Sequence, residues 1–274
     1  MDIHIDIETV PAQDPAIIAE MEEEAREQRE ALESSYREKL DAVVAPKNYK
    51  DPEKIADYME SKKEELLAWL ERQKAQLEED ADEKYRKTAL DGARGEICVI
   101  SWAVNDGPIR HVCQDPTGQA ADADEAGMLR EFFKDLQADA EELPPESRNR
   151  RLRWIGHNIL GFDLRFIFQR CVIHQIPPAV SLHQAAPPHS DFIFDTMLEW
   201  AGFRGRVSES NLCKALGIAD KGSELEGTDA EGIDGSQVWD YVKAGRLDDV
   251  VTYCDGDVDR SRRIFNALTF RGAA

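Results

Sequence analysis

The sequence has no long apolar run and no basic leader. No apolar stretch approaches the roughly 18 residues that a membrane span requires. The first residues also lack a basic segment followed by an apolar one, the pattern of a secretion signal. We therefore expect a cytoplasmic protein.

Closely spaced cysteine pairs are also absent. The cysteines stand singly and form no CxxC motif; they are Cys98, Cys113, Cys171, Cys213 and Cys254. An odd number of scattered cysteines in a chain of this length indicates reduced thiols, and predicts no zinc site.

Basic residues are in the minority, with 34 Lys and Arg against 55 Asp and Glu, and the formal net charge is −21. A protein that binds nucleic acid by charge alone would be basic. The chain therefore either avoids nucleic acid or contacts it locally, with metal ions offsetting acidic ligands. Its 274 residues suffice for one large or two small domains.

The first residues alternate in polarity. Ile3, Ile5 and Ile7 would share one face of a strand, and the intervening residues, including Asp6 and Glu8, the other. This predicts a strand over residues 2–8 that ends at residues 9–11.

Residues 14–87 differ in composition, being rich in Glu, Lys, Arg, Gln and Ala. Apolar residues recur at helical spacing on both sides of a break at residues 45–54, which contain Pro46 and Pro52. We expect two long helices in an antiparallel hairpin that projects from the main domain. Such an arm could be a solvated extension without chemistry, a guide for a substrate strand, or a docking surface.

The rest of the chain alternates between strand and helix signals. A hairpin over 96–104 and 109–113 precedes a helix at 124–139, a strand at 152–158 and a helix soon after Gly161; mainly helical patterns follow. The order predicts an α/β fold, a mixed sheet flanked by helices. Its domain would comprise residues 1–13 and 88–274, with residues 14–87 as a helical hairpin insertion after the first strand.

Four carboxylates lie where strands and helices meet. Asp6 and Glu8 would be about 7 Å apart on one strand face. Asp163 follows the strand ending near residue 158, and Asp257 shares a helix face with Tyr253, four residues earlier. Acids that converge from separate elements suit hard divalent cations such as Mg²⁺ or Mn²⁺. Two such ions can clamp the oxygens of a phosphodiester.

These motifs resemble those of a known superfamily. DIET with Asp6 and Glu8, HNILGFD with Asp163, and YCDGD with Tyr253 and Asp257 are similar to the three motifs of DEDD 3′–5′ exonucleases. Within this superfamily the chain most resembles exonucleases related to the proofreading domain of family B DNA polymerases, often encoded by phages and prophages. The resemblance implies a ribonuclease H-like fold over residues 1–11 and 88–274.

Tyr253 indicates the tyrosine subclass, because the residue at the histidine position of the other subclass is Thr252. Asp255 is a rival for the last acid, but it falls on a different helix face from Tyr253. The resemblance implies that Asp6, Glu8 and Asp257 hold one ion and that Asp6 and Asp163 hold the second. It further implies that Tyr253 orients the attacking water.

Substrate contacts follow partly from the resemblance, which places Asn158, Thr9 and Phe162 near the terminal nucleotide. Basic residues in a Gly- and Ser-bearing segment are candidates for backbone phosphates; they are Arg204, Arg206, Lys214 and Lys221. The basic run at 148–153 is a further candidate. For His157 we favour packing or hydrogen bonding over metal ligation, and for Asp195 a helix N-cap over a place in the cleft.

The expected activity is metal-dependent removal of nucleoside 5′-monophosphates from a DNA 3′ end, preferably single-stranded. RNA is the alternative substrate. The alternative class is a catalytically weak nuclease-like scaffold whose helical arm binds a protein partner or a second copy.

Overall fold

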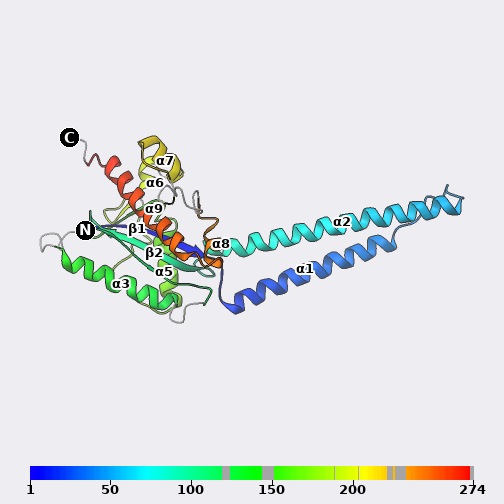
Figure 1. The fold of residues 1–274 in the computed structure, drawn as a ribbon, viewed down its shortest axis with the longest axis horizontal. Helices are drawn as coiled ribbons and strands as arrows, with labels where there is room; N and C mark the ends of the chain where they lie inside the picture. Colours follow the sequence, from blue (N-terminus) through cyan, green and yellow to red (C-terminus); the bar gives the residue numbers. More distant parts are fainter. Residues whose placement is uncertain are drawn as a thin grey trace. The chain divides into compact units, whose positions relative to one another are not determined.

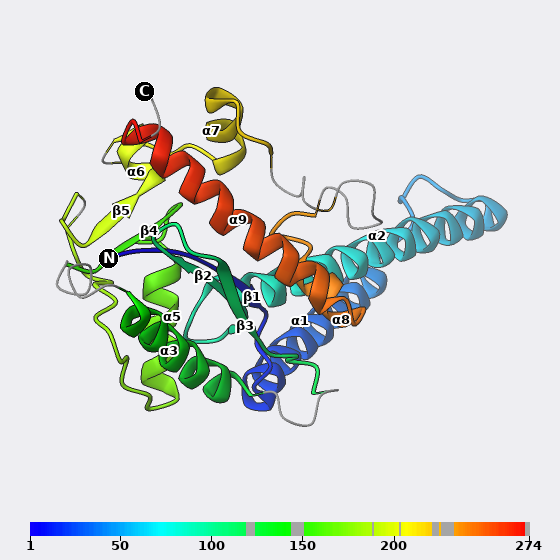
Figure 2. The same ribbon diagram turned by 60° about the vertical axis from the view of Figure 1, so that its left-hand side comes forward.

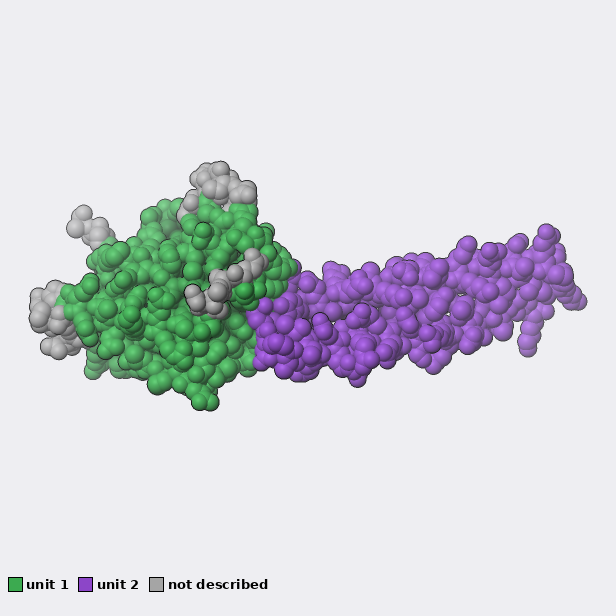
Figure 3. Space-filling view, turned by 60° about the horizontal axis from the view of Figure 1, so that its bottom comes forward, with its two compact units in different colours: residues 1–11, 88–274 green, residues 12–87 purple. Residues whose placement is uncertain are grey.

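The computed structural model describes residues 1–118, 124–143, 151–187, 189–202, 204–220, 225 and 233–271. It divides into two compact units, residues 1–11 with 88–274 and residues 12–87, which Figure 3 colours separately. None of the helices in the described ranges combines the length and hydropathy needed to cross a bilayer.

The first unit is built on a five-stranded mixed sheet of α/β class (Figure 1). The strand order is β3-β2-β1-β4-β5; β1 pairs antiparallel with β2 and parallel with β4. The strands are β1 (Asp2–Val10), β2 (Glu96–Val104), β3 (Ile109–Cys113), β4 (Arg153–Gly156) and β5 (Ile193–Asp195). The predicted hairpin at residues 96–113 is confirmed as β2 and β3.

Helices cover both faces of this sheet, with α9 on one side and α3 and α5 on the other (Figure 2). The helices of this unit are η1 (Thr88–Leu90), α3 (Glu125–Glu142), α5 (Asp163–Ile173), α6 (Thr196–Ala201), α7 (Glu209–Leu216), α8 (Val238–Lys243) and α9 (Leu247–Leu268). Their positions agree with the helical patterns of the sequence.

The alternation in β1 decides which face meets which helix. Ile3, Ile5 and Ile7 are buried in a core cluster with residues of α3 and α5. On the opposite face, the His4 ring packs edge-on against Phe265 of α9, with ring centroids 5.5 Å apart. The polar face of β1 is therefore directed at α9.

The strand β1 extends beyond the predicted end at residue 8. Its pairing with β2 shifts register between Glu8 and Thr9, and the strand then continues to Val10, followed by Pro11. A bulge of this kind re-aims side chains without ending the pairing. The strand thus runs past the predicted residues 2–8 but ends at Val10, within residues 9–11, where its end was predicted.

The second unit consists of α1 (Pro15–Asp41) and α2 (Pro52–Lys87). Ion pairs join Lys84 to Glu24 and Lys74 to Glu33, so the two helices run antiparallel. No residue of α1 is buried, and Leu70 is the buried residue of α2. The apolar residues between α1 and α2 are therefore, apart from Leu70, at most partly buried.

Candidate functional site

The polar face of β1 contributes two of the predicted acids. Asp6 is half-buried and Glu8 is 9% exposed. They occupy alternate positions on one strand, so their carboxylates project on the same side, beside α9. The bulge follows immediately after Glu8.

The helix α9 brings Cys254 to these acids. Its Sγ donates to the backbone oxygen and to Oδ2 of Asp6, each at 3.5 Å. One ligand atom from each of Asp6, Glu8 and Cys254 lies within 4.8 Å of the others. The sequence interpretation missed Cys254, although its spacing of three residues from Asp257 places it on the same helix face.

Asp163 reaches β1 from the first position of α5. Its Oδ1 accepts a hydrogen bond of 3.2 Å from the Ile7 N–H, and the residue is 3% exposed. β4 pairs with β1 only as far as His4, so the Ile7 N–H lies beyond the paired stretch on that side. At the end of β4, a Cβ on Gly156 would lie 2.7 Å from the Ile5 oxygen and even closer to Cγ2 of Ile159, so the close approach of these groups requires glycine.

Asp257 is also buried, but its partner is a cation of the protein. Arg260 Nε donates to Asp257 Oδ1 at 3.0 Å, and the Nη2 of Arg260 binds the same oxygen. The same guanidinium lies 3.7 Å from Oε2 of Glu209. The sequence interpretation missed both Arg260 and Glu209. The spacing of three residues between Asp257 and Arg260 was the available signal.

Tyr253 is 2% exposed and belongs to a cluster with Val10 and Cys98, on the side of the sheet that α9 covers. Its place on α9, four residues before Asp257, follows the predicted spacing. The role expected for its hydroxyl, which is to orient a water molecule, stays a prediction.

The donor set at Asp6 and Glu8 fits a hard divalent cation. Mg²⁺ binds oxygen at about 2.0–2.1 Å, which places opposite ligands about 4 Å apart. One ligand atom from each member of the cluster lies within 4.8 Å of the others, a spacing of similar size. Burial, with Asp6 and Glu8 adding to it, raises the pKa of the Cys254 thiol well above its usual range. A protonated thiol is a poor ligand for such an ion.

Of the four predicted metal ligands, the structure thus brings Asp6 and Glu8 together. Asp163 is instead hydrogen-bonded to the Ile7 N–H of β1, and Asp257 to Arg260 within α9. The rival acid, Asp255, accepts from Ser101 Oγ at 2.7 Å and lies 3.1 Å from His111 Nδ1. It faces β2 and β3, which agrees with its predicted position on another face of the helix.

The turn after β4 holds Asn158 in an uncommon conformation. Its φ is 61°, a left-handed value that asparagine tolerates better than most residues. Asp195 Oδ1 accepts from the Asn158 N–H at 2.9 Å, and Oδ2 accepts from the Leu160 N–H at 3.2 Å. Asp195 also caps α6, as predicted. Its carboxylate therefore fixes the turn that carries Asn158.

The other predicted nucleotide contacts have structural partners. Thr9 Oγ1 donates to the Ala89 oxygen at 2.7 Å. Phe162 is half-buried, and its ring lies 5.4 Å from that of Phe166. Contact of either residue with a nucleotide stays a prediction.

Two of the predicted phosphate contacts, Arg204 and Arg206, lie on the loop after α6. Arg204 and Arg206 are exposed there. The backbone oxygen of the next residue, Val207, is hydrogen-bonded to His157 Nε2 at 3.0 Å. Because His157 precedes Asn158, this loop lies beside the Asn158 turn. The interpretation of His157 as a hydrogen-bonding residue is confirmed. Lys221 lies outside the described residues.

The basic run is only partly described, since residues 148–150 lie outside the described ranges. Arg151 pairs with Asp191 at 2.6 Å, and Arg153 pairs with Asp2 at 3.0 Å. Lys214, the remaining phosphate candidate, pairs with Asp220 at 3.3 Å. Contacts of these side chains with a substrate strand stay predictions.

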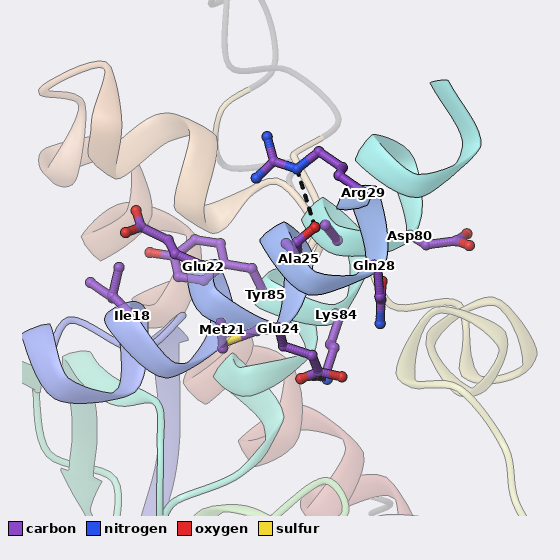
Figure 4. Close-up of a pocket in the computed structure, with 11 residues that line it drawn as sticks. Ile18, Met21, Glu22, Glu24, Ala25, Gln28, Arg29, Asp80, Lys84 and Tyr85 are labelled. Atoms are coloured by element: carbon purple, nitrogen blue, oxygen red, sulfur yellow. Dashed lines mark hydrogen bonds and ion pairs between the residues drawn. The ribbon is translucent and has the colours of Figure 1, made fainter. Parts of the chain in front are cut away.

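The second unit has a groove of its own, about 440 Å³ in volume, between α1 and α2. Figure 4 shows Ile18, Met21 and Ala25 of α1 beside Tyr85 of α2. The charged residues Glu22, Glu24, Arg29, Asp80 and Lys84 also line it. No sequence-predicted site residue lies in this groove.

Comparisons with known proteins find little similarity. No family model and no curated protein matches the chain. One similar solved structure is the family B DNA polymerase from the hyperthermophilic archaeon Pyrobaculum calidifontis, with a TM-score of 0.46 and 14% identity. The match covers 66% of this chain but only 22% of the polymerase chain. At this level it assigns neither a family nor a function.

Proposed function

We propose that the chain is a metal-dependent 3′–5′ exonuclease of ribonuclease H-like architecture, acting on DNA with a free 3′ end. The observation that carries this proposal is the meeting of Asp6 and Glu8 of β1 with the Cys254 face of α9, within 4.8 Å. That helix also carries Tyr253 and Asp257, and Asp163 is hydrogen-bonded to the same strand. The order and spacing of these residues resemble the DEDD exonuclease motifs.

Two divalent ions, Mg²⁺ or Mn²⁺, would lower the pKa of a bound water and neutralise charge that develops on the phosphodiester. Asp6, Glu8 and Asp257 would hold one ion, and Asp6 with Asp163 the other. Close carboxylates repel one another without such compensation. The cluster therefore suits a charged cofactor better than it suits a purely structural role.

The remaining residues would bind and orient the substrate. Tyr253 would position the attacking water through its hydroxyl, which is too weak a base at neutral pH to remove the proton itself. Asn158, Thr9 and Phe162 would hold the terminal nucleotide, and Arg204, Arg206 and Lys221 the backbone phosphates. In support, the Arg206–Val207 segment adjoins the Asn158 turn through His157.

The test is a strand-shortening assay with Mg²⁺ or Mn²⁺ on DNA and RNA oligonucleotides, each labelled at the 5′ end. We expect a ladder of products that shorten from the 3′ end, release of nucleoside 5′-monophosphates, and no reaction in chelator. Asp6→Asn and Asp257→Asn should reduce the rate to background.

Asp255→Asn is the matched control, because this acid is also on α9 but binds Ser101 and His111. It should retain activity. The absence of metal-dependent shortening by the unmodified protein would refute the proposed function, and activity that survives both Asp6→Asn and Asp257→Asn would refute the site. Faster shortening of RNA than DNA would establish the alternative substrate.

A further inference from the structure

Two buried carboxylates share one buried guanidinium next to the proposed metal site. Arg260 is 4% exposed, and it binds Asp257 Oδ1 through Nε at 3.0 Å. Its Nε is also 3.7 Å from Oε2 of Glu209, which is 4% exposed. Asp257 and Arg260 are one turn apart on α9, whereas Glu209 is the first residue of α7.

A guanidinium in this position competes with a divalent ion for Asp257. A charge-assisted hydrogen bond from the guanidinium occupies one carboxylate oxygen and offsets part of its negative charge, which weakens that oxygen as a metal ligand. The guanidinium is itself unfavourable to leave buried without a carboxylate, because a buried charge needs a compensating partner. The bonds from Nε and Nη2 of Arg260 both go to Asp257 Oδ1, so binding of an ion at that oxygen requires a second acceptor for Arg260.

Glu209 has the placement of such an acceptor. The distance from Arg260 Nε to its carboxylate is longer by less than 1 Å than the distance to Asp257. Arg260 also borders a groove of about 440 Å³ that Gly256 and Asp259 line, so space for side-chain movement lies next to it.

We propose that Arg260 is an internal counter-ion that leaves Asp257 for Glu209 when Asp257 binds a divalent ion. Arg260 and Glu209 are then positioning residues that set the metal affinity of the site. This inference rests on the proposed metal-dependent function.

The experiment measures Mn²⁺ binding to the full chain by electron paramagnetic resonance of free Mn²⁺. Arg260→Gln should bind Mn²⁺ about tenfold or more tightly, the size of effect that one adjacent charge has on a carboxylate. Glu209→Gln should bind it several-fold more weakly, because Arg260 then stays on Asp257.

The double variant Arg260→Gln/Glu209→Gln separates the two roles. If Glu209 acts through Arg260, removing Glu209 should have little effect on Mn²⁺ affinity once Arg260 is gone. The double variant also removes the charge of Glu209 together with that of Arg260, which lies 3.7 Å from it. The matched control is Arg263→Gln, which removes the same charge from an exposed pair with Asp259 on α9.

Thermal unfolding supplies the second readout. Arg260→Gln should unfold at a lower temperature than the unmodified protein without Mn²⁺, and should gain more from saturating Mn²⁺. Weaker Mn²⁺ binding by Arg260→Gln, or equal affinities in all variants, would overturn the inference and leave the nuclease proposal standing. If the unmodified protein shows no Mn²⁺ binding that Asp6→Asn abolishes, both fail.

Discussion

At the scale of single residues, His4 on the polar face of β1 has a pKa that its surroundings lower. It lies two positions before Asp6, is 2% exposed, and its Nδ1 has no hydrogen-bond partner among the described residues. Burial, followed by the nearby Arg262, lowers the pKa of His4 to about 4. The folded protein therefore keeps this ring neutral beside the acidic cluster.

This shift predicts a pH-dependent stability. The folded pKa is below the unfolded value of about 6.5, so the unfolded chain binds the proton more tightly and folding weakens as pH falls from 6.5 toward 4. His4 alone should account for about 3 kcal/mol of that loss. Urea unfolding at pH 7 and pH 4.5 should show a smaller drop in His4→Leu than in the unmodified protein. Equal drops would contradict the pKa assignment.

Asp195 does more than the predicted capping of α6. Besides capping α6 through the N–H groups of Met197 and Leu198, it binds the N–H groups of Asn158 and Leu160. Asp195→Ala should therefore lower the free energy of unfolding by about 2 kcal/mol or more. If the proposed function holds, it should also reduce kcat/KM for strand shortening about tenfold, because the turn that carries Asn158 would be misplaced.

Asp124→Ala supplies the comparison for this prediction. Asp124 caps α3 through one bond to Gly127 and has no described link to the candidate site. It should cost about 1 kcal/mol of stability and leave kcat/KM unchanged. Equal kinetic effects of the two substitutions would show that Asp195 acts only as a cap.

At the scale of elements, one buried ion network joins two helices to the sheet. Glu125 at the start of α3 accepts hydrogen bonds from Nε and Nη2 of Arg170 in α5, and its Oε1 also accepts from the Ile97 N–H of β2 at 2.8 Å. His174 Nε2 lies 2.6 Å from the same carboxylate. This network fixes α5, whose first residue is Asp163.

Removal of Glu125 leaves Arg170 buried without its carboxylate. Glu125→Ala should lower the free energy of unfolding by about 3–5 kcal/mol. By contrast, Glu23→Ala in the second unit breaks a solvent-exposed pair with Arg26 and should have a much smaller effect on stability. Chemical denaturation of both variants tests this, and similar losses in the two would show that the network contributes little.

At the scale of the whole molecule, the two units differ in how they are stabilised. The first buries its apolar residues in clusters on both faces of its sheet. In the second unit, Leu70 is the buried residue of α2, and none of the residues of α1 is buried. Thr9 Oγ1 lies 2.7 Å from the Ala89 oxygen, so the chain leaves the first unit and re-enters it at neighbouring points.

Replacement of residues 12–87 by a short Gly-Ser linker should therefore leave a folded first unit. We expect cooperative unfolding and, if the proposed function holds, metal-dependent shortening of single-stranded DNA at a rate near that of the full chain. Circular dichroism and the strand-shortening assay measure both. A linker variant that fails to fold would show that the first unit depends on the helical pair. Loss of activity in a folded variant would give the helices a role in substrate handling.

Much of the fold was predictable because its signals are local. The alternation of Ile3, Ile5 and Ile7 and the hairpin over residues 96–104 and 109–113 each depend on near neighbours in the sequence. The shift in register between β1 and β2 after Glu8 was not predictable, because the bulge depends on pairing with a strand about 90 residues away in the sequence.

The sequence by itself determined which acids could act together and which helix face would carry Tyr253 and Asp257, since spacing within one element fixes a shared face. Only the tertiary structure decided that Cys254 lies against Asp6, that Asp163 binds the Ile7 N–H, and that Arg260 stands between Asp257 and Glu209. These contacts join segments far apart in the chain. Local residue patterns do not specify which distant segments pack together, so the contacts could not be predicted from the sequence.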